Sequence, residues 1–255
     1  MCIRDSTRTG EIFISRAAVV ALADGQTADL VTLGVAANGN LYRTDSASTT
    51  YDPSGFVCFK ASDGFYVVQI SKIAKFTDCD LNAWYAPYVE QALAQGLFDG
   101  VSDTQFAPKK AMSRAMLVTV LWRAAGQPAV SDSSTFADVA DPDAWYYDAV
   151  VWAASNGIVD GYSDTVFGPN DPLTRQQMVT ILYRFDQLNG GKPAGDTDMS
   201  GYTDWADVSD WAQDAFQWAV GSGIVDGVSD TSLAPAGSAQ RCEVATILVR
   251  YLASR

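Results

Sequence analysis

The sequence predicts a mainly α-helical protein in which three tandem helix–loop–helix repeats follow a small β-rich segment. Three observations predict this class. Seven landmark residues recur at the same offsets in three copies, and each copy contains two stretches with the apolar periodicity of an amphipathic helix. The first 75 residues differ, because short β-branched and aromatic runs alternate there with turn-forming residues.

Residues 1–75 contain four short runs that predict strands, namely DLVTL, NLYRT, FVCFK and FYVVQI. The sequences ANGN, DPSG and SDG separate these runs and are typical of hairpin turns. We expect this segment to be the end of a larger β domain. Since the chain leads directly into strand-like sequence, we also expect it to begin within a longer protein, with any signal peptide upstream.

An internal repeat organises the remaining residues. A tryptophan opens each copy, followed by glycines at +12 and +16, an aspartate at +19, a proline at +24, arginines at +30 and +39, and a leucine at +37. An aromatic-x-Asp element precedes each tryptophan and starts at Phe76, Phe136 and Trp205. The repeats are therefore predicted to span residues 76–125, 136–188 and 202–253.

The second copy predicts the structure of one repeat. Apolar residues from Trp145 to Ala153 follow helical spacing, with Trp145 opening the apolar face and Gly157 ending the helix. IVDGYSDTVFGPNDP predicts an ordered loop in which Ile158 and Phe167 point inward, and LTRQQMVTILYRF predicts the second helix. Because one helix pair cannot bury both of its apolar faces, we expect the repeats to pack as a pseudo-threefold, three-lobed body.

Each repeat places an arginine at the predicted start of its second helix. In the second copy, Thr174 is a good N-cap and Gln177 completes a capping box, so Arg175 lies in the first turn. A cation is locally unfavourable there, so we expect a carboxylate or phosphate to bind the guanidinium and the free backbone N–H groups. Arg114 and Arg241 occupy this position in copies with less complete capping boxes, so the second site should bind best.

Two other interpretations of the landmark residues stay open. In the first, the arginine pairs with an aspartate of the neighbouring repeat and joins the repeats. In the second, Trp84, Trp145 and Trp211 are core residues, although an aromatic ring beside an anion-binding arginine also suits the face of a sugar.

Composition argues against several functions. The formal net charge of −13 disfavours nucleic acid and anionic membranes as partners, and no apolar run is long enough for membrane insertion. The absence of histidine excludes a Ser-His-Asp triad and histidine-ligated zinc.

The four scattered cysteines are read as small apolar fillers. The DG-x-SDT loops predict Asx-type turns, because no glutamate follows to close a calcium site, so no metal or cofactor is expected.

The ordered set of aromatic-x-Asp, Trp, GIVDG, F-x-P and TRxx, repeated over residues 76–253, resembles the S-layer homology domain family. The resemblance implies a three-lobed module that anchors exported bacterial proteins non-covalently to a secondary cell-wall polysaccharide, often one that bears ketal-linked pyruvate. It also implies an extracellular location in the cell wall or surface layer. SRAM and QRCE depart from the family's TRAE motif, and Leu233 replaces the aromatic Phe106 and Phe167 of the other copies.

In this family, the motif arginine and nearby aromatic and glycine residues line grooves between lobes. A pyruvate ketal carries a carboxylate, so the implied ligand agrees with the anion site expected at the helix start. With the predicted N-cap Thr174, the candidate ligand-binding residues are Arg114, Arg175, Arg241, Trp84, Trp145, Trp211, Gly100, Gly161 and Gly227.

A carbohydrate-binding anchor without catalysis is the leading hypothesis. The first alternative is a structural module that assembles with other proteins of a surface layer or self-associates. The second is a fragment of a glycoside hydrolase, because such enzymes need only two carboxylates. Against an enzyme, the acidic residues recur as loop residues in every copy, whereas an active site needs one unique pair.

Overall fold

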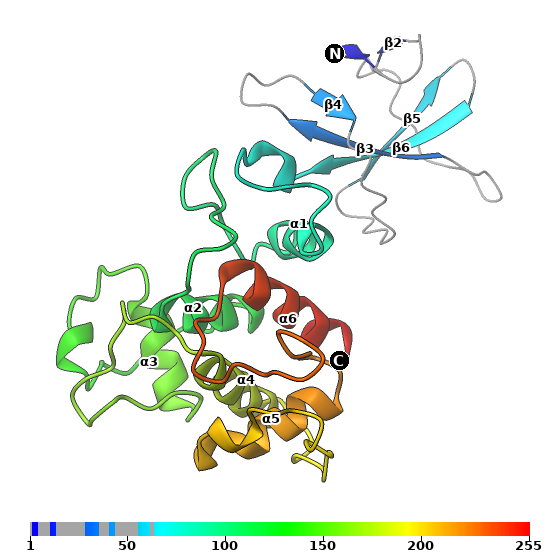
Figure 1. Cartoon of the computed structure of the whole chain (residues 1–255). Coiled ribbons are helices and arrows are strands. Elements are labelled where there is room, and N and C mark those ends of the chain that lie inside the picture. Colours follow the sequence, from blue (N-terminus) through cyan, green and yellow to red (C-terminus); the bar gives the residue numbers. More distant parts are fainter. Residues whose placement is uncertain (1, 5–10, 14–28, 36–40, 44–55, 62–63) are drawn as a thin grey trace. The chain divides into compact units, whose positions relative to one another are not determined.

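The structure is a computed structural model that describes residues 2–4, 11–13, 29–35, 41–43, 56–61 and 64–255 (Figure 1). Side chains are described from residue 72 onward. The chain divides into two compact units, Met1–Pro108 and Lys109–Arg255. The second unit contains the complete second and third repeats and the second helix of the first repeat.

The first unit contains the strands. One sheet has the order β4-β3-β6-β5, and a separate antiparallel pair consists of β1 and β2. The strand bounds are Cys2–Arg4 for β1, Glu11–Phe13 for β2, Asp29–Val35 for β3, Leu41–Arg43 for β4, Phe56–Ala61 for β5 and Gly64–Ser71 for β6.

The strand pairing agrees only in part with a series of hairpins. β3 pairs antiparallel with β4, and β5 pairs antiparallel with β6, as hairpins require. β3 and β6 run parallel, so a longer connection and not a tight turn joins them. The predicted turn sequences ANGN and DPSG lie outside the described residues.

A 3-10 helix, η3 (Ile73–Lys75), and helix α1 (Ala86–Ala94) follow the sheet within the first unit. The carboxylate of Glu90 on α1 accepts hydrogen bonds from the backbone N–H groups of Lys72 and Ile73, both at 2.9 Å. This buried carboxylate therefore ties the segment after β6 to α1.

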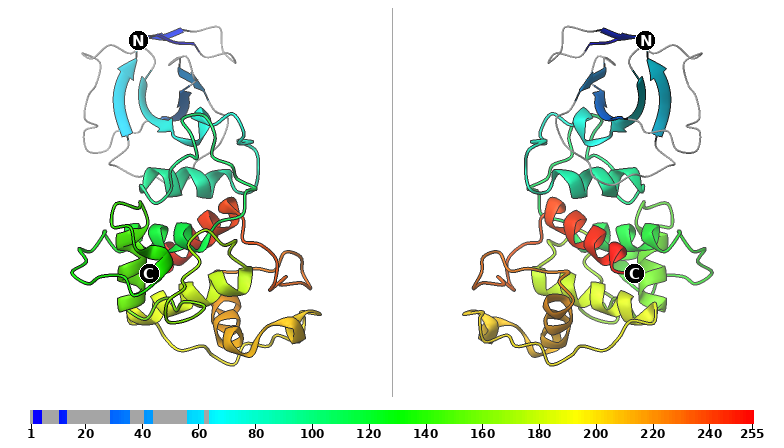
Figure 2. Two further views of the ribbon diagram at one scale, coloured as in Figure 1. Left: turned by 90° about the vertical axis from the view of Figure 1, so that its left-hand side faces the viewer. Right: turned by 90° about the vertical axis from the view of Figure 1, so that its right-hand side faces the viewer.

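The second unit contains five helices among its described residues, and α2, α4 and α6 lie next to one another there, with α3 and α5 outside them (Figures 1 and 2). The helix–loop–helix prediction is confirmed. No helix in the described part of the chain is long and apolar enough to cross a membrane. The bounds are Arg114–Ala124 for α2, Tyr147–Ser155 for α3, Arg175–Leu188 for α4, Asp210–Gly221 for α5 and Arg241–Ala253 for α6, with 3-10 helices η4 (Ala137–Val139) and η5 (Trp205–Asp207).

A closed ring of backbone hydrogen bonds joins the segments that precede α2, α4 and α6. The Met112 N–H donates to the Ala239 carbonyl at 2.9 Å, the Ala239 N–H to the Leu173 carbonyl at 2.9 Å, and the Leu173 N–H to the Met112 carbonyl at 2.8 Å. These buried residues each lie 28 positions after the tryptophan of their repeat. The starts of the second helices therefore have a threefold arrangement, while the packing of three complete lobes stays a prediction.

A carboxylate fixes the loop of each repeat. In the second repeat, Asp138 accepts hydrogen bonds from the backbone N–H groups of Phe167 at 2.9 Å and Gly168 at 2.7 Å. Asp78 does the same in the first repeat. The predicted inward positions of Ile158 and Phe167 are confirmed, since both are fully buried. The aromatic-x-Asp element thus places the loop aromatic in the core.

The third aromatic-x-Asp element was assigned to the wrong residues. Asp204 accepts hydrogen bonds from the backbone N–H groups of Leu233 at 2.9 Å and Ala234 at 2.8 Å. The element is therefore Tyr202-Thr203-Asp204, and not the sequence that starts at Trp205. Two such elements overlap here, and the tryptophan appeared the better match, but only the first brings its carboxylate to the loop.

The first helix of the second repeat begins after its landmark tryptophan. Trp145 precedes α3, is 58% exposed and packs edge-on against Tyr146, so its predicted place on the apolar helix face is wrong. Ala149 and Ala153 on that face are buried as expected. Gly157 follows the helix with φ of +67°, which confirms its predicted role in ending the helix.

Candidate ligand-binding groove

The starts of α2 and α4 are not free to bind an anion through their first backbone N–H groups. The N–H of Arg114 donates to the carbonyl of Asp171 at 3.1 Å, and the N–H of Arg175 donates to the carbonyl of Gly237 at 2.8 Å. Both acceptors belong to the loop of the following repeat. The expectation of N–H groups that await an anion is therefore wrong, because packing between repeats satisfies them.

The Arg114 side chain crosses from the first repeat to the loop of the second. Its Nε donates to the Phe167 carbonyl at 3.0 Å, and its Nη2 donates to the Asp160 carbonyl at 2.7 Å. The guanidinium carbon lies 4.7 Å from the ring centroids of both Tyr162 and Phe167. Burial lowers the pKa of Arg114, while Tyr162 and Asp171 oppose that shift, and the side chain stays cationic.

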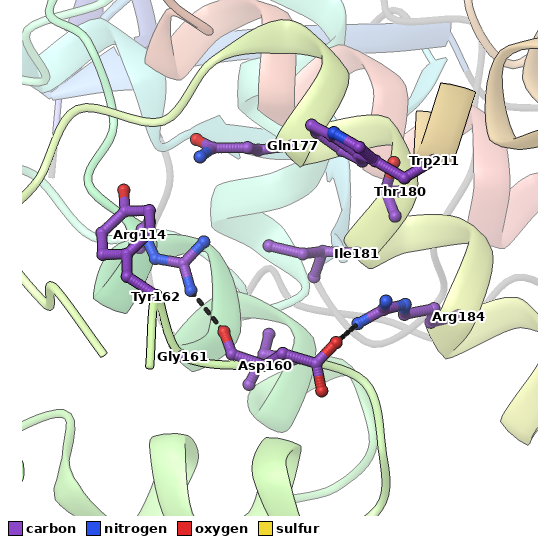
Figure 3. Close-up of a pocket in the computed structure, with 10 residues that line it drawn as sticks. Arg114, Asp160, Gly161, Tyr162, Gln177, Thr180, Ile181, Arg184 and Trp211 are labelled. Atoms are coloured by element: carbon purple, nitrogen blue, oxygen red, sulfur yellow. Dashed lines mark hydrogen bonds and ion pairs between the residues drawn. The ribbon is translucent and has the colours of Figure 1, made fainter. Parts of the chain in front are cut away.

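A groove of about 260 Å³ opens beside this guanidinium (Figure 3). It combines three repeats, because Arg114 comes from the first, the loop and helix α4 from the second, and Trp211 from the third. Its volume lies just below the range of small-molecule pockets, about 300 to 1,000 Å³, so it can hold only a small group. The lining residues are Arg114, Val159, Asp160, Gly161, Tyr162, Gln177, Thr180, Ile181, Arg184 and Trp211.

Two N–H donors at this groove have no acceptor within the described part of the chain. Nη1 of Arg114 has no such partner, unlike Nε and Nη2, and it points toward the space between Gln177 and Ile181 (Figure 3). The amide oxygen of Gln177 accepts from the Thr174 N–H at 3.1 Å, which leaves the amide NH2 group as the free end. A buried cation with an unused donor favours a negatively charged acceptor.

An ion pair borders the groove. Nη1 of Arg184 on α4 lies 2.6 Å from Oδ2 of Asp160 in the loop. The equivalent pair in the third repeat joins Arg250 and Asp226 at 2.5 Å. Since the Asp160 side chain is 74% exposed, such a pair contributes at most about 1 kcal/mol to stability. Its effect is to orient the loop toward its own second helix.

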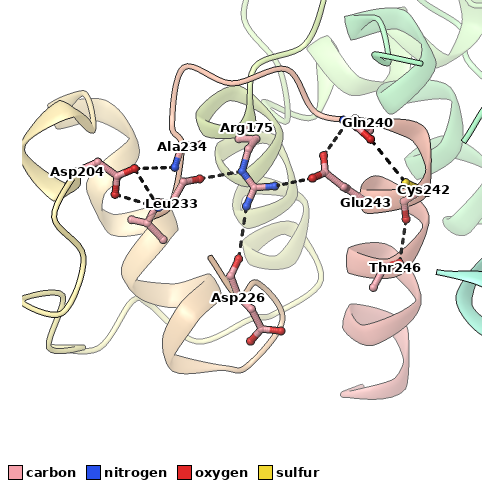
Figure 4. Close-up of polar contacts among 9 residues, drawn as sticks. All are labelled: Arg175, Asp204, Asp226, Leu233, Ala234, Gln240, Cys242, Glu243 and Thr246. Atoms are coloured by element: carbon pink, nitrogen blue, oxygen red, sulfur yellow. Dashed lines mark hydrogen bonds and ion pairs between the residues drawn. The ribbon is translucent and has the colours of Figure 1, made fainter. Parts of the chain in front are cut away.

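Arg175 makes the same crossing from the second repeat to the third, but its environment differs (Figure 4). Nε donates to the Leu233 carbonyl at 2.8 Å and Nη2 to the Asp226 carbonyl at 3.4 Å. Nη1 lies 3.5 Å from Oε1 of Glu243, the third residue of α6. Burial lowers the pKa of Arg175, and the charge of Glu243 opposes that shift. The carboxylate of Glu243 therefore pairs with Nη1 of Arg175, whereas Nη1 of Arg114 has no such partner among the described residues.

The family model of the S-layer homology domain matches residues 75–115, 135–179 and 201–245, which together make up more than half of the chain. The chain belongs to the S-layer homology domain family. Each match contains the loop of one repeat and the arginine that starts its second helix. Seven of the ten residues that line the groove at Arg114 lie within these matches.

The S-layer homology repeats are similar to parts of much longer proteins. The chain is 32% identical to the Surface-layer 125 kDa protein of Lysinibacillus sphaericus, over 73% of this chain and 16% of that protein. It is 29% identical to an amylopullulanase of Thermoanaerobacterium thermosulfurigenes, over 78% of this chain and 10% of the enzyme. It is 28% identical to a cellulosome-anchoring protein of Acetivibrio thermocellus, over 58% of this chain and 33% of that protein.

The candidate arginines and tryptophans of the S-layer homology repeats have opposite exposure. The tryptophans are not core residues, so that interpretation is wrong. Arginines 114 and 175 do join neighbouring repeats, mainly through loop carbonyls and not through aspartate side chains. The exposed fractions are 6% for Arg114, 4% for Arg175, 6% for Arg241, 60% for Trp84, 58% for Trp145 and 56% for Trp211.

The second glycine of each S-layer homology repeat shapes its loop. A Cβ atom at Gly161 would clash with the carbonyl oxygen of Ser163, and one at Gly227 would clash with that of Ser229. Gly100 is equally confined. Of the three, Gly161 also lines the groove at Arg114. These positions need glycine for close backbone packing, whatever the ligand.

The capping box at Thr174 is confirmed, because its hydroxyl accepts from the Gln177 N–H at 3.3 Å while Gln177 accepts from the Thr174 N–H. Thr174 itself does not line the described groove. Sequence analysis missed Tyr162 and assigned Gln177 only to capping. The available signal was the residue after the second loop glycine, which is aromatic in this repeat but Val101 and Val228 in the others.

No group of cysteine, aspartate or glutamate side chains in the described residues could hold a metal ion. Cys242 agrees with the expected apolar filler, since burial and the neighbouring Glu243 charge raise its pKa to about 11. Cys79 is partly exposed and is not part of a disulfide. The side chains of Cys2 and Cys58 lie outside the described residues.

Proposed function

We propose that this chain attaches a surface protein non-covalently to the bacterial cell wall by binding an anionic secondary polysaccharide between its repeats. The observation that carries the proposal is the groove at Arg114, where a buried guanidinium with an unused donor lies beside Tyr162. Membership of the S-layer homology family, and likeness to surface-layer and cellulosome-anchoring proteins, support attachment at the cell surface.

The chemistry of the groove favours a sugar that carries a carboxylate. A guanidinium binds carboxylates through charge-assisted hydrogen bonds, and the second donor, on Gln177, lies on the facing wall. Tyr162 and Trp211 are 53% and 56% exposed, and their flat rings suit the apolar face of a pyranose. A ketal-linked pyruvate on a sugar ring meets both requirements, because it fixes a carboxylate to the edge of the ring.

The overall charge of the chain makes this recognition local. A net charge of −13 repels an anionic polymer at long range, so electrostatic steering does not drive association. The attraction has to come from direct contact with the buried cation, where water is largely excluded and a hydrogen bond is stronger than at the surface. A polysaccharide without a negative group should therefore bind weakly.

We propose attachment and no catalysis for these repeats. The match to the amylopullulanase spans 10% of that enzyme, which leaves most of its length to carry an activity elsewhere. The carboxylates that recur in the repeats already have structural partners, such as the loop N–H groups held by Asp138 and the ion pair of Asp160.

Co-sedimentation with purified peptidoglycan sacculi tests the proposal. The chain should pellet with sacculi that retain their secondary polysaccharide and stay in the supernatant when hydrofluoric acid has removed it. Trp211→Ala should weaken pelleting about tenfold, which corresponds to about 1.4 kcal/mol of lost contact with a sugar ring. Leu188→Ala is the matched control, because Leu188, the last residue of α4, is also an exposed large apolar residue but does not line the groove.

Three results would contradict the proposal. Equal pelleting with stripped and intact sacculi would make peptidoglycan itself, and not the polysaccharide, the partner. If the chain ignores both kinds of sacculi and instead forms oligomers in solution, as measured by sedimentation velocity, the module assembles proteins. Release of soluble sugar from the sacculi would point to an enzyme.

A further inference from the structure

The three landmark tryptophans are held in different ways. Trp84 and Trp145 precede their helices, and each packs edge-on against the tyrosine that follows it, with ring centroids 5.7 Å and 5.1 Å apart. Trp211 is the second residue of α5, is followed by Ala212, and has no such ring partner among the described residues. Of the three, Trp211 is the one that lines the groove at Arg114 (Figure 3). A contact other than ring packing therefore has to fix its position.

The start of α5 is held from the neighbouring repeat by Gln176, the second residue of α4. The side-chain oxygen of Gln176 accepts a hydrogen bond from the backbone N–H of Ser209 at 3.2 Å. Ser209 is the N-cap of α5, but its own side chain makes no capping hydrogen bond. Gln176 thus supplies a polar contact at the end of the helix that carries Trp211.

This glutamine is particular to the second repeat. The equivalent residues are Ala115 in α2 and Cys242 in α6, which are small and buried. Neither has an amide or carboxyl oxygen that could accept a hydrogen bond from another repeat. The glutamine therefore occurs in the repeat that precedes the one tryptophan without a following tyrosine.

A second contact between α4 and α5 lies about two turns further along both helices. Tyr183 of α4 and Trp218 of α5 pack with their ring centroids 5.4 Å apart, and Trp218 is buried. Because Trp211 lies seven residues before Trp218, the two side chains share one face of α5 and lie about 10 Å apart along its axis. The aromatic contact holds the later part of α5, and the hydrogen bond from Gln176 holds its start.

We propose that Gln176 positions Trp211 in the groove by holding the start of α5 against α4. Without this hydrogen bond, α5 would be free to pivot about its contact with Tyr183, and a tilt of about 10° would move its first turn by about 2 Å. A gap of about 0.5 to 1 Å already removes a quarter to a half of the van der Waals attraction across a contact. Gln176 does not line the groove, so it acts through Trp211. The inference rests on the proposed function, because it concerns the same ligand-binding groove.

Two substitutions separate the hydrogen bond from the size of the side chain. Gln176→Met keeps a similar length and removes the acceptor, whereas Gln176→Glu keeps an acceptor oxygen. Both should preserve α4, because methionine and glutamate form helices about as well as glutamine. Gln217→Met is the matched control, since Gln217 is a half-buried glutamine of α5 that does not line the groove and whose side chain makes no hydrogen bond within the described part of the chain.

Co-sedimentation of the whole chain with increasing amounts of polysaccharide-bearing sacculi measures binding. Gln176→Met should weaken pelleting about threefold, less than Trp211→Ala does, because the ring is displaced and not removed. Gln217→Met should pellet as wild type does. In the Trp211→Ala background, Gln176→Met should cause no further loss, since the residue through which it acts is already absent.

Hydrogen exchange of the Ser209 amide tests the contact itself. This amide should exchange faster in Gln176→Met, which has no acceptor for it, and at the wild-type rate in Gln176→Glu and Gln217→Met. A structural role of Gln176 elsewhere in α4 would not produce this pattern.

The remaining outcomes count against the inference. If Gln176→Met pellets as wild type does, or weakens pelleting by the same factor with and without Trp211, the inference is overturned while attachment through the groove stands. Unchanged exchange of the Ser209 amide in Gln176→Met overturns it as well. If wild type does not pellet with polysaccharide-bearing sacculi, the proposed function fails and the inference fails with it.

Discussion

Arg114 and Arg175 occupy equivalent positions in their repeats, yet their guanidinium groups differ in the donors that remain without an acceptor among the described residues. Both arginines are buried, and Nε of each donates to a loop carbonyl, that of Phe167 or Leu233. The N–H group of the same loop residue donates to Asp138 or Asp204. Beside Arg175, Glu243 supplies an acceptor, and beside Arg114 the equivalent Gln177 supplies none. The comparison teaches that a repeated arginine marks a repeated structural contact, while the residues around it differ from one copy to the next.

The largest expected effect is the loss in the free energy of unfolding when each arginine is replaced. Arg175→Met should lower the free energy of unfolding by about 3 kcal/mol, because the carboxylate of Glu243 and the Leu233 carbonyl lose their donor. Arg114→Met should cost about 1 to 2 kcal/mol, since it leaves no carboxylate unpaired. Urea unfolding followed by circular dichroism measures both.

The variant that destabilises the fold more, Arg175→Met, should affect binding to the cell wall less. Below the unfolding transition, Arg175→Met should pellet with polysaccharide-bearing sacculi as wild type does, and Arg114→Met should stay in the supernatant. If the folded Arg114 variant keeps binding, the groove at Arg114 is not the site of attachment.

The pH dependence of stability sharpens the comparison at the loop of the third repeat, which Arg175 contacts. Burial acts to raise the pKa of Asp204, but hydrogen bonds from the Leu233 and Ala234 N–H groups and the Ser232 hydroxyl lower it below its usual range. A carboxyl whose folded pKa is depressed stabilises the fold above its unfolded pKa of about 3.9, and this contribution is lost as pH falls through the folded value.

Stability measured by urea unfolding should therefore fall as pH decreases from about 5 through the depressed pKa of folded Asp204, and least steeply in Asp204→Asn. Ser232→Ala removes one donor at 2.8 Å and should give an intermediate slope. An equal slope in wild type and Asp204→Asn would mean that other carboxylates control acid unfolding.

The smallest expected effect concerns the aromatic ring beside Arg114. Tyr162→Val gives the second repeat the residue that Val228 provides at the equivalent position of the third repeat, and it removes a cation–π contact of 4.7 Å. Pelleting with polysaccharide-bearing sacculi should weaken about fivefold, which corresponds to about 1 kcal/mol. Val228→Tyr is the matched control and should leave pelleting unchanged, because Val228 does not line the groove at Arg114. An equal loss in both variants would show that the ring of Tyr162 does not contact the ligand.

Much of the fold could be predicted because the helix ends and caps of each repeat depend on residues that are close together in the sequence. The helix ends at Gly157 and the capping box at Thr174 depend on neighbours in the chain, so spacing alone identifies them. The third aromatic-x-Asp element was misplaced because two overlapping candidates, Tyr202-x-Asp204 and Trp205-x-Asp207, satisfy the same local pattern. Only the distant partner, the N–H group of Leu233, distinguishes them.

The site was harder to predict because its parts come from three repeats. The sequence places Arg175 in a helix start, but the carbonyls that occupy that start belong to residues about sixty positions away. The pairing of Arg175 with Glu243 could not be read from either residue alone. Gln177 was assigned only to capping. Its amide oxygen does cap the helix, because it accepts from the Thr174 N–H, but its side chain also lines the groove.

The ring formed by Met112, Leu173 and Ala239 has a consequence for the order in which a nascent chain becomes active. A chain that emerges from its N-terminus supplies Ala239 only after the third repeat has been made, so the ring cannot close earlier. Trp211 of the groove also belongs to the third repeat. A chain that stalls before the third repeat would therefore lack both the closed ring and the complete groove, so under the proposed function wall binding would require that all three repeats have been made.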